Sequence, residues 1–528
     1  MTLHGQCFVG NQLSRGSGET FQAKSPLDGS LLETAFFRAN ERDVDEAMRL
    51  GEQACQTYRL ASNEERAAFL EAIAEEILGL GDSLILRTHL ETGLPNARLE
   101  NERARTVGQL RMFAQVAREG SWVDARIDTA IPDRQPVPKP DLRRMLMPIG
   151  PVIVFGSSNF PFAYSVAGGD TASALATGNP VIVKAHSGHP GASELVATAV
   201  HRAATRVGLP EGVFSMLHGV GNKIGTALVR HPCARAVGFT GSRAAGRALF
   251  DVAAARQDPI PVFAEMSSLN PIFILPEAMR ERGAAIAEGL RTSITTGVGQ
   301  FCTKPGLVFG IKGSAFNALE DVLGKLLAAV APATMLHAGI CESYHTGLAR
   351  ASAAKGVAQV SRSGAAADIS KTEGESVLLK IDVPSFLANP DLREEVFGPF
   401  SLLIGGESLV ELETAARALD GQLTATVHGT TTDLEQAMPL LRILERKAGR
   451  LIVNGFPTGV EVCPSMNHGG PYPATTDVRF TSVGTAALLR FVRPICYQNF
   501  PATLLPQALK NENPLRLSRI INGVRSSE

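Results

Sequence analysis

Between residues 151 and 265, short apolar runs alternate with segments of helical periodicity, and this alternation constrains the fold more than any other feature. The apolar runs do not alternate strictly with polar residues, which indicates strands covered on both faces. Strands joined by helices form parallel sheets through right-handed crossovers. We therefore predict a parallel α/β sheet with strands at 152–155, 181–183, 213–217, 236–239 and 260–263, and helices near 162–177, 191–207, 222–230 and 243–256.

The same alternation resumes after residue 270 and predicts a second α/β domain. We expect its strands at 272–275, 307–311, 400–404, 424–427 and 451–453, with helices reaching to about residues 296 and 330. Before the first sheet, helical spacing predicts helices at 43–58, 63–78 and 96–119, with Ser62 or Asn63 and Asn96 as N-caps. Residues 355–375, rich in Ala, Ser and Gly, are expected to form a surface loop.

Composition narrows the class of protein. A chain of 528 residues exceeds what one hydrophobic core supports, so several domains are expected. Lys plus Arg (51) nearly balances Asp plus Glu (52), so no basic field favours nucleic acid or an anionic membrane, and a small molecule is the expected partner. The N-terminus lacks a signal-peptide pattern and no segment has 18 uninterrupted apolar residues, so neither export nor a membrane span is expected.

The seven cysteines are odd in number, widely spaced and never arranged as Cys-x-x-Cys. This pattern argues against a disulfide framework and a zinc site, and it fits a reducing cytoplasm. Cys302 stands out because it lies in the glycine-flanked stretch Gly297-Val-Gly-Gln-Phe-Cys-Thr-Lys-Pro305, between a predicted helix and a predicted strand. A thiol there becomes reactive if a helix N-terminus or a cation lowers its pKa, although a lone cysteine is more often a structural residue.

Two distant segments accompany Cys302. Glu265 lies in Phe263-Ala-Glu-Met-Ser-Ser-Leu-Asn-Pro271, and Asn159 lies in Pro151-Val-Ile-Val-Phe-Gly-Ser-Ser-Asn-Phe-Pro161. Together with the cysteine loop, these segments resemble the signature segments of the aldehyde dehydrogenase superfamily, and the resemblance extends from about Gly29 to Pro501. It implies an α/β fold with a Rossmann-like dinucleotide-binding domain, a second α/β catalytic domain and a small oligomerisation hairpin.

With this resemblance the chain divides into five expected parts. These are an N-terminal helical part (1–131), the first part of an oligomerisation hairpin (132–150), the Rossmann-like domain (151–266), the catalytic domain (267–470) and a return to the cofactor domain with an oligomerisation tail (471–528). Residues 132–140 contain four prolines, which excludes a helix interior or a central strand. The apolar tail at 488–505 suits burial against another subunit, so we expect a homodimer or homotetramer.

The resemblance assigns catalytic roles. The Cys302 thiolate would add to the aldehyde carbonyl, and the Asn159 side chain with the Cys302 backbone N–H would stabilise the resulting oxyanion. Glu265 would act as the general base that activates water against the thioester, with its pKa raised by burial. A turn residue for Asn159 and a surface carboxylate for Glu265 are the alternatives when each is taken alone.

The resemblance also implies NAD or NADP as the cofactor. Backbone N–H groups of a strand-to-helix turn would face its phosphates, in the stretch that contains Gly238, Thr240, Gly241, Ser242 and Gly246. Lys184, which we count in the catalytic and the cofactor-binding sets, resembles the lysine on the adenosine ribose, and Glu395 with Phe397 resembles the pair beside the nicotinamide ribose. Ser187 replaces a glutamate that is common in NAD-preferring members, so we expect NADP to be preferred.

The substrate is expected to be 2,5-dioxopentanoate, oxidised to 2-oxoglutarate, because segments around 263–271, 466–473 and 489–500 are most similar to the bacterial dehydrogenases of this semialdehyde. Arg111 is the candidate for binding its carboxylate. Phe160, Tyr164, Phe301 and Phe456 are candidates for lining the tunnel, and an apolar tunnel would favour medium-chain aliphatic aldehydes instead.

One further alternative remains. A cysteine-dependent acyl transferase or hydrolase without a redox step is the alternative of another class. No metal site is expected, because His186 and His189 lack a third ligand or a His-Glu-x-x-His frame. His468-Gly-Gly470 is interpreted as a backbone turn rather than as a catalytic base. Most arginines of the 96–119 segment are interpreted as a solvated helix face.

Overall fold

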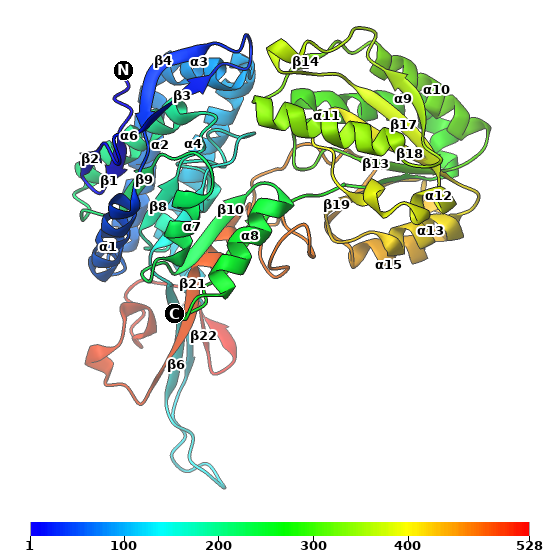
Figure 1. Ribbon diagram of the computed structural model, residues 1–528. Coiled ribbons are helices and arrows are strands. Elements are labelled where there is room, and N and C mark those ends of the chain that lie inside the picture. The colour runs from blue at the N-terminus through cyan, green and yellow to red at the C-terminus, as the bar shows by residue number, and fades with distance from the viewer. Residues whose placement is uncertain (1, 527–528) are drawn as a thin grey trace.

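The computed structural model describes residues 2–526 and consists of two α/β lobes side by side, with an arm that projects from the first lobe (Figure 1). The order of strands in the first lobe is β11-β10-β7-β8-β9-β1-β2. The first five of these are mutually parallel, and β1 and β2 add an antiparallel edge. Their bounds are β1 Cys7–Val9, β2 Gln12–Ser14, β7 Val152–Phe155, β8 Val181–Lys184, β9 Phe214–Leu217, β10 Ala236–Thr240 and β11 Val262–Glu265.

All five predicted strands of this sheet are present, so the predicted parallel sheet is confirmed. β11 begins two residues later than predicted, after Pro261, which has no N–H to donate to a ladder. From β7 the chain continues to β8 and β9 on one side, whereas β10 and β11 lie on the other side of β7. In sheets of this kind, ligands bind beside the carboxyl ends of the two strands at which the direction reverses, here β7 and β10. Asn159 follows β7, and the turn of Gly241 follows β10.

Helices cover both faces of this sheet. One core contains α2 (Asn63–Gly79), α4 (Asn96–Glu119), α5 (Gly169–Ala176) and α6 (Pro190–Val207), and the opposite core contains α1 (Glu41–Tyr58), α7 (Lys223–Arg230) and α8 (Arg243–Ala254). Ser62 caps α2, as predicted, whereas Asn96 is the first residue of α4 and Pro95 occupies the cap. The sequence analysis missed α3 (Gly81–Thr92) and the hairpin β3 (Thr20–Lys24) with β4 (Leu31–Phe37).

The predicted helix at 162–177 begins only at Gly169. The preceding residues form a turn, because the buried Glu102 carboxylate accepts hydrogen bonds from the backbone N–H groups of Phe162 (2.8 Å) and Ala163 (3.0 Å). The N–H of Ser157 also donates to the carbonyl of Tyr164 at 2.9 Å. This turn holds residues 159–164 beside the second lobe rather than in a helix.

The second lobe is built on the sheet β15-β17-β18-β13-β12-β19-β20, in which all neighbours except β15 and β17 are parallel. The strands are β12 Ile272–Ile274, β13 Leu307–Ile311, β15 Ala358–Arg362, β17 Val377–Asp382, β18 Phe400–Gly406, β19 Gln422–His428 and β20 Ala448–Val453. The covering helices are α9 Pro276–Thr295, α10 Ser314–Ala328, α11 Ala338–Ala353, α12 Val383–Ala388, α13 Leu409–Ala418, α14 Thr431–Gln436 and α15 Met438–Glu445.

The predicted surface loop at 355–375 is partly wrong, because β15 lies in it and pairs with the unpredicted central strand β17. β15 is an edge strand with few apolar residues, so its sequence carries little strand signal. The short pair β14 (Ala333–Thr334) and β16 (Glu373–Gly374) closes the same region. Within the described residues no helix is both long and apolar enough to cross a membrane.

The arm consists of the sheet β21-β6-β5-β22-β23 and the loop that joins β5 to β6. Its strands are β5 Arg126–Asp128, β6 Leu142–Pro148, β21 Val492–Gln498, β22 Arg519–Ile521 and β23 Val524–Ser526. The proline-rich segment 132–140 forms the exposed tip, and only an isolated bridge between Ile131 and Lys139 joins its two sides. The return of the C-terminal segment to β6 therefore builds the arm from two segments that are far apart in the sequence.

Candidate active site

Cys302 lies in a tight loop between α9 and β13. Gly297, Val298 and Gly299 all have positive φ angles (57°, 56° and 66°), an unusual conformation for the β-branched Val298 that marks a strained segment. A Cβ on Gly299 would lie 2.3 Å from the carbonyl oxygen of Gly398. The Asn270 side chain fixes the other end of the loop by donating to the carbonyl of Cys302 at 2.8 Å. The loop is therefore held on both sides of the thiol.

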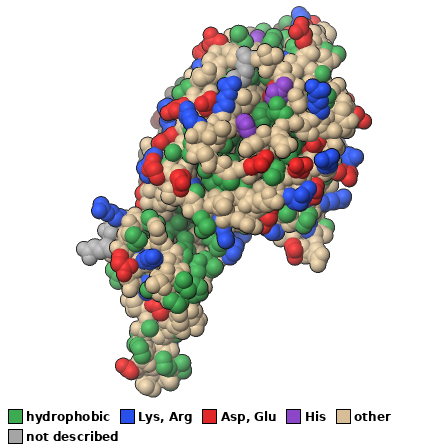
Figure 2. Space-filling view, turned by 90° about the vertical axis from the view of Figure 1, so that its left-hand side faces the viewer, with side chains coloured by type: hydrophobic (Ala, Val, Ile, Leu, Met, Phe, Trp, Pro, Cys, Tyr) green, Lys and Arg blue, Asp and Glu red, His purple; other side chains and the backbone are tan. Residues whose placement is uncertain are grey.

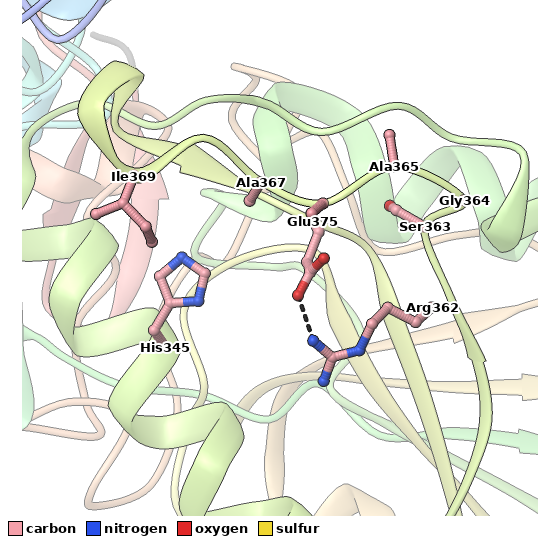
Figure 3. A pocket seen from close by; sticks show the side chains of 9 residues that line it. His345, Arg362, Ser363, Gly364, Ala365, Ala367, Ile369 and Glu375 are labelled. Carbon is pink, nitrogen blue, oxygen red and sulfur yellow. Dashed lines mark hydrogen bonds and ion pairs between the residues drawn. The ribbon is translucent and has the colours of Figure 1, made fainter.

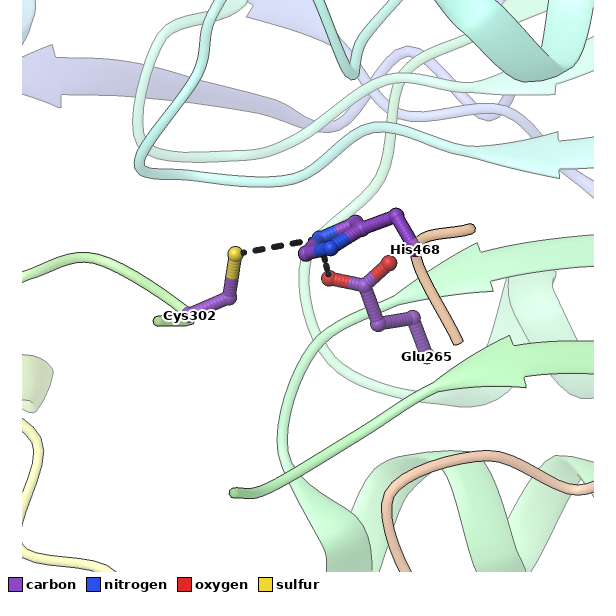
Figure 4. A group of neighbouring side chains, drawn as sticks. All are labelled: Glu265, Cys302 and His468. Carbon is purple, nitrogen blue, oxygen red and sulfur yellow. Dashed lines mark hydrogen bonds and ion pairs between the residues drawn. The ribbon is translucent and has the colours of Figure 1, made fainter. Parts of the chain in front are cut away.

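Cys302 is brought together with Glu265 and His468 (Figure 4). The Cys302 Sγ lies 3.4 Å from the His468 Nε2, and the same Nε2 lies 3.0 Å from the Glu265 Oε1. The side chains of His468 and Glu265 are almost fully buried, with 1% and 3% of their surface exposed. Three groups that exchange protons thus meet at one point, where the two lobes join.

The local environment sets the protonation of two of these groups. Burial raises the pKa of the Cys302 thiol well above its usual value, and the Glu265 charge raises it further, against a smaller opposing effect of Arg105. Burial alone would raise the pKa of Glu265, but the charge and hydrogen bond of His468 and the hydroxyl of Ser482 outweigh it and hold the pKa below its usual value. The predicted raised pKa of Glu265 is therefore wrong, and Cys302 requires a neighbouring base to become a thiolate.

The segment after the second lobe positions His468 and Glu265. The Ser482 Oγ donates to the Glu265 Oε2 at 2.6 Å, and the backbone N–H of Ser482 donates to the carbonyl of His468 at 2.8 Å. Behind the two side chains lies a small cavity of about 20 Å³, which is bounded by Thr481, Ser482 and others, and a cavity of this size holds one water molecule. His468 belongs to the turn that the sequence predicted, but no sequence signal indicated its proximity to Cys302.

Asn159 is buried and reaches the cysteine loop. Its Nδ2 donates to the carbonyl of Gln300 at 3.1 Å, two residues before Cys302. The backbone carbonyl of Asn159 accepts a hydrogen bond of 2.9 Å from Arg98 on α4. The amide N–H group is therefore held beside the residue that carries the thiol, which brings the three sequence-predicted residues into one site.

Aromatic side chains form one wall next to Cys302. Phe160 lies between Tyr164 and Phe301, with both ring centroid distances at 5.3 Å, and the Arg98 guanidinium lies 4.7 Å from the Phe160 centroid. The candidate Phe456 is not part of this wall. Its ring fills the space above Gly289 of α9 and lies 5.0 Å from His428, so it packs in the core of the second lobe.

The arginines of α4 do not form a uniform solvated face. Arg111 is exposed, so the structure does not support it as the residue that binds a substrate carboxylate. Arg105 of the same helix instead reaches the Tyr164 hydroxyl at 3.3 Å and the carbonyl of Val460 at 2.8 Å. Arg98 pairs with the buried Glu102 at 3.1 Å. Only the packing of neighbouring segments distinguishes these arginines.

The predicted phosphate-binding turn joins β10 to α8. Ser242 caps the helix by accepting a hydrogen bond of 3.3 Å from the N–H of Ala245, and the first turn of α8 is exposed. A Cβ on Gly241 would lie 2.6 Å from the Phe239 ring, and one on Gly246 would lie 2.7 Å from the Met266 sulfur. The exposed N-terminus of α8 and the two glycines, Gly241 and Gly246, are compatible with a bound dinucleotide phosphate.

Other cofactor candidates lie around this turn. Lys184 ends β8, and its Nζ donates to the carbonyl of Gly219 at 2.8 Å, while burial lowers its pKa to about 8. The nearby His186 ring stacks on His189 at 5.2 Å and lies 5.7 Å from His337 of the second lobe. Ser187 and Thr240 lie at the same edge as Lys184, at the carboxyl ends of β8 and β10. Gly238 lies in the middle of β10, where an added Cβ would lie 2.8 Å from the Asp170 carboxylate.

Glu395 and Phe397 lie in the loop before β18. Burial raises the pKa of Glu395, against the charge of Lys304, and burial lowers the pKa of Lys304. The Lys304 ammonium donates to the carbonyls of Val396 (3.0 Å) and Phe400 (2.9 Å), so a residue two positions after Cys302 holds the loop of Glu395. The sequence analysis missed this role of Lys304.

A separate surface hollow of about 410 Å³ shares no residue with the Cys302 site (Figure 3). Its charged groups are already neutralised, because Arg362 pairs with Glu375, and His345 contacts the carbonyl of Glu373 at 3.2 Å. It contains no nucleophile paired with a base. The chemistry therefore points to the Cys302 site and not to this hollow.

The donor atoms of Glu265, Cys302 and His468 all lie within 4.8 Å of one another, and theirs is the one such group of three metal-ligand types among residues 2–526. The sequence analysis expected no metal site and did not foresee this group. Its members already contact one another as acid and base, with the thiol beside an imidazole and the imidazole beside a carboxylate. This arrangement transfers protons from a thiol without a metal.

The chain matches a known protein family and two relatives over nearly its whole length. The model of the "Aldehyde dehydrogenase family" matches residues 13–472. The chain is 50% identical over 524 residues to the alpha-ketoglutaric semialdehyde dehydrogenase 2 of Azospirillum brasilense, covering 99% of each chain. It is 45% identical over 522 residues to the alpha-ketoglutaric semialdehyde dehydrogenase of Acinetobacter baylyi, covering 99% of this chain and 98% of that protein.

Solved structures share the fold. A variant of betaine aldehyde dehydrogenase from Staphylococcus aureus, solved in complex with NAD⁺, superposes with a TM-score of 0.79 at 19% sequence identity, covering 94% of this chain and 97% of that one. The family match spans both lobes and all three motifs that surround the thiol. The chain is thus an oxidoreductase that acts on an aldehyde with NAD(P)⁺, and it belongs to the aldehyde dehydrogenase family.

Proposed function

We propose that this enzyme oxidises 2,5-dioxopentanoate, the semialdehyde of 2-oxoglutarate, to 2-oxoglutarate, with NADP⁺ preferred over NAD⁺. The observation that carries the chemistry is the contact of the Cys302 thiol with His468 at 3.4 Å, together with the contact of His468 with Glu265 at 3.0 Å. The names of the two relatives, which are 50% and 45% identical over nearly the whole chain, support the substrate.

In the first half of the reaction, Cys302 gives its proton to the adjacent base and its sulfur adds to the aldehyde carbon. The carbonyl oxygen then becomes an oxyanion of a thiohemiacetal, which the Asn159 amide and the Cys302 backbone N–H stabilise. The raised pKa of Cys302 makes the base necessary, and the His468 imidazole contacts the thiol at 3.4 Å. A bound nicotinamide would accept the hydride from the thiohemiacetal carbon. Loss of that C–H bond lets the oxyanion re-form the C=O bond, which leaves the acyl group on Cys302 as a thioester.

In the second half, the acyl group leaves Cys302 as a carboxylic acid. Glu265 takes a proton from water, the hydroxide adds to the thioester carbon, and the C–S bond breaks to restore the thiolate. The cavity of about 20 Å³ beside Glu265 and His468 has room for one such water. Because the pKa of Glu265 is held low, the carboxylate is already ionised at neutral pH and available as a base.

The proposed preference for NADP⁺ depends on Ser187. A carboxylate at this position would repel a 2′-phosphate, by roughly 4 kcal/mol per charge pair at 4 Å and an effective dielectric of 20. Ser187 has no charge, and the nearby Lys184 offers a cation at the end of β8. Ser187→Glu should therefore lower kcat/KM for NADP⁺ more than for NAD⁺. Equal losses with both cofactors would show that Ser187 does not face the ribose.

We also propose a homo-oligomer that assembles through the arm and works in a reducing compartment such as the cytoplasm. Apolar side chains gather on the arm, whereas charges are scattered over the body (Figure 2). Val137, Phe500 and Leu504 on the arm are 61%, 43% and 66% exposed, and such a patch is typical of an interface. All seven cysteines are free thiols, which supports the reducing compartment.

The experiment that tests the function is a panel of aldehydes assayed with both cofactors by the absorbance of the reduced nicotinamide. We expect the highest kcat/KM for 2,5-dioxopentanoate with NADP⁺, and a clearly lower value for hexanal. A higher kcat/KM for hexanal would instead support the oxidation of medium-chain aliphatic aldehydes. This outcome would be consistent with aldehyde oxidation, but it would contradict 2,5-dioxopentanoate as the preferred substrate.

A further inference from the structure

Two half-buried arginines from different lobes hold the same loop next to the aromatic wall. Arg105 of α4 donates to the carbonyl of Val460 at 2.8 Å, and Arg450 of β20 donates to the carbonyl of Pro457 at 2.8 Å and to that of Gly459 at 3.3 Å. Consecutive Cα atoms are about 3.8 Å apart, so the two guanidinium groups bind neighbouring carbonyls of one short loop. One cation from each lobe therefore reaches the loop at 457–460.

Neither cation has an anionic partner in the described part of the chain. No carboxylate forms an ion pair with Arg105 or Arg450, and the Nε atom of each is buried without a hydrogen-bond partner. Glu102 is the carboxylate nearest in sequence, but its oxygens already accept from Phe162, Ala163 and Arg98. The charge of Glu102 does act on Arg105. Because neither half-buried cation forms an ion pair of its own, the two arginines suit an anion that arrives from outside the chain.

The pair lies at a suitable place for the far end of a short substrate. Arg105 contacts the Tyr164 hydroxyl at 3.3 Å, and Tyr164 packs through Phe160 onto Phe301, the residue before Cys302. Against the larger effects of burial, the charge of Arg105 lowers the pKa of Cys302, and the charge of a Cys302 thiolate raises the pKa of Arg450. The carboxylate carbon of an extended five-carbon chain lies roughly 5 Å from its aldehyde carbon, given four bonds of about 1.5 Å.

We propose that Arg105 and Arg450, with the Tyr164 hydroxyl, form the subsite that binds the distal carboxylate of a short oxo-acid aldehyde. Each guanidinium keeps a free N–H toward a carboxylate oxygen, and the Tyr164 hydroxyl can donate while it accepts from Arg105. The subsite exists only when both lobes are in place, because α4 and β20 supply one arginine each. This inference rests on the proposed substrate and extends it to named residues.

The test compares Arg105→Gln and Arg450→Gln with the parent on 2,5-dioxopentanoate and on hexanal. We expect each variant to lower kcat/KM for the charged substrate by about tenfold or more, mainly through KM, and to lower kcat/KM for hexanal clearly less. Arg105→Lys, which keeps the charge, should recover part of the loss. Arg103→Gln is the matched control, because Arg103 lies on α4 and also binds a backbone carbonyl, that of Gly81 at 3.0 Å.

A second measurement separates this subsite from the proposed substrate. In the parent, 2-oxoglutarate should inhibit the oxidation of hexanal, and both glutamine variants should weaken this inhibition about tenfold, whereas Arg103→Gln should not. If the parent prefers hexanal but this inhibition still depends on the two arginines, the result supports the carboxylate subsite and contradicts the proposed substrate. If the variants lose both substrates equally, or keep the preference for the charged one, the arginines only hold the loop and the subsite is overturned.

Discussion

At the scale of single residues, the environment of Cys302 determines which groups the reaction needs. Burial and the neighbouring Glu265 charge keep the thiol protonated, so a base must take its proton before it can attack an aldehyde. His468 is placed for this step by its backbone contacts to Thr481 and Ser482. The sequence motifs identified the nucleophile and the carboxylate but not the imidazole between them.

His468→Gln should therefore slow the reaction of Cys302 more than it changes the fold. We expect alkylation of Cys302 by iodoacetamide to slow by about tenfold or more at pH 7, because the thiolate is the reacting form. The matched control is His345→Gln, since His345 belongs to the surface hollow of the second lobe. An unchanged alkylation rate in His468→Gln would mean that another group deprotonates the thiol.

The pKa of Lys184 predicts how cofactor binding depends on pH. Burial lowers this pKa to about 8, so the ammonium loses its charge as the pH rises through about 8 in the free enzyme. The affinity for NADP⁺ should fall over this range, because an anion is bound best by the charged form. Fluorescence titration of Lys184→Met should show weaker binding that no longer changes near pH 8. A parent affinity that stays constant from pH 7 to pH 9 would contradict this role.

At the scale of elements, the sequence was most informative where a strand is buried and parallel. The apolar runs of β7 to β11 and of β12, β13 and β18 to β20 predicted both sheets, because covering both faces leaves only apolar positions. The edge strand β15 and the central strand β17 were missed, the first because it is polar. The motifs similarly placed Asn159, Glu265 and Cys302 together.

Contacts between distant segments could not be predicted. Arg105 and Arg111 occupy one helix, and the contacts of Arg105 with the loop at 457–460 and with the Tyr164 hydroxyl distinguish the half-buried arginine from the exposed one. Phe456 was predicted to line the substrate tunnel, but its ring packs in the core of the second lobe, where Gly289 leaves space for it. His468 reaches Cys302 because the chain returns along β11, where Thr475 bridges to Glu265.

The loop of Cys302 gives a prediction at this scale. Gly299→Ala places a Cβ 2.3 Å from the Gly398 carbonyl at a φ of 66°, so the cysteine loop and the loop of Glu395 and Phe397 must separate. We expect kcat/KM to fall at least about tenfold and the melting temperature to fall. Gly283→Ala on α9 is the control, since nothing lies within 4 Å of its added Cβ and alanine favours a helix by about 1 kcal/mol. Normal activity in Gly299→Ala would show that the loop tolerates this displacement.

At the scale of the whole molecule, the two lobes contribute different parts of one site. The first sheet presents Glu265 and the phosphate-binding turn at its carboxyl ends, and the second lobe supplies Cys302 and Arg450. The arm lies outside this arrangement and exposes apolar side chains (Figures 1 and 2). We therefore propose that catalysis takes place at the junction of the lobes and that the arm mediates assembly.

Charged substitutions on the arm should dissociate the oligomer. The double variant Phe500→Asp/Leu504→Asp should shift the native mass, measured by light scattering, toward that of one chain. Val410→Asp, at a position that is 68% exposed on the second lobe, should leave the mass unchanged. A parent that is monomeric at all concentrations, or a double variant that stays oligomeric, would contradict assembly through these residues.

The most direct test of the account is a single turnover of Glu265→Gln mixed rapidly with 2,5-dioxopentanoate and NADP⁺. If Cys302 forms a thioester that Glu265 helps to hydrolyse, one equivalent of reduced cofactor per site should appear in a burst, followed by slow turnover. Mass spectrometry of the quenched protein should then find the acyl group on the peptide of Cys302, and Cys302→Ala should give neither burst nor adduct. A burst without an acylated Cys302, or equal loss of burst and turnover in Glu265→Gln, would contradict the covalent mechanism proposed for this site.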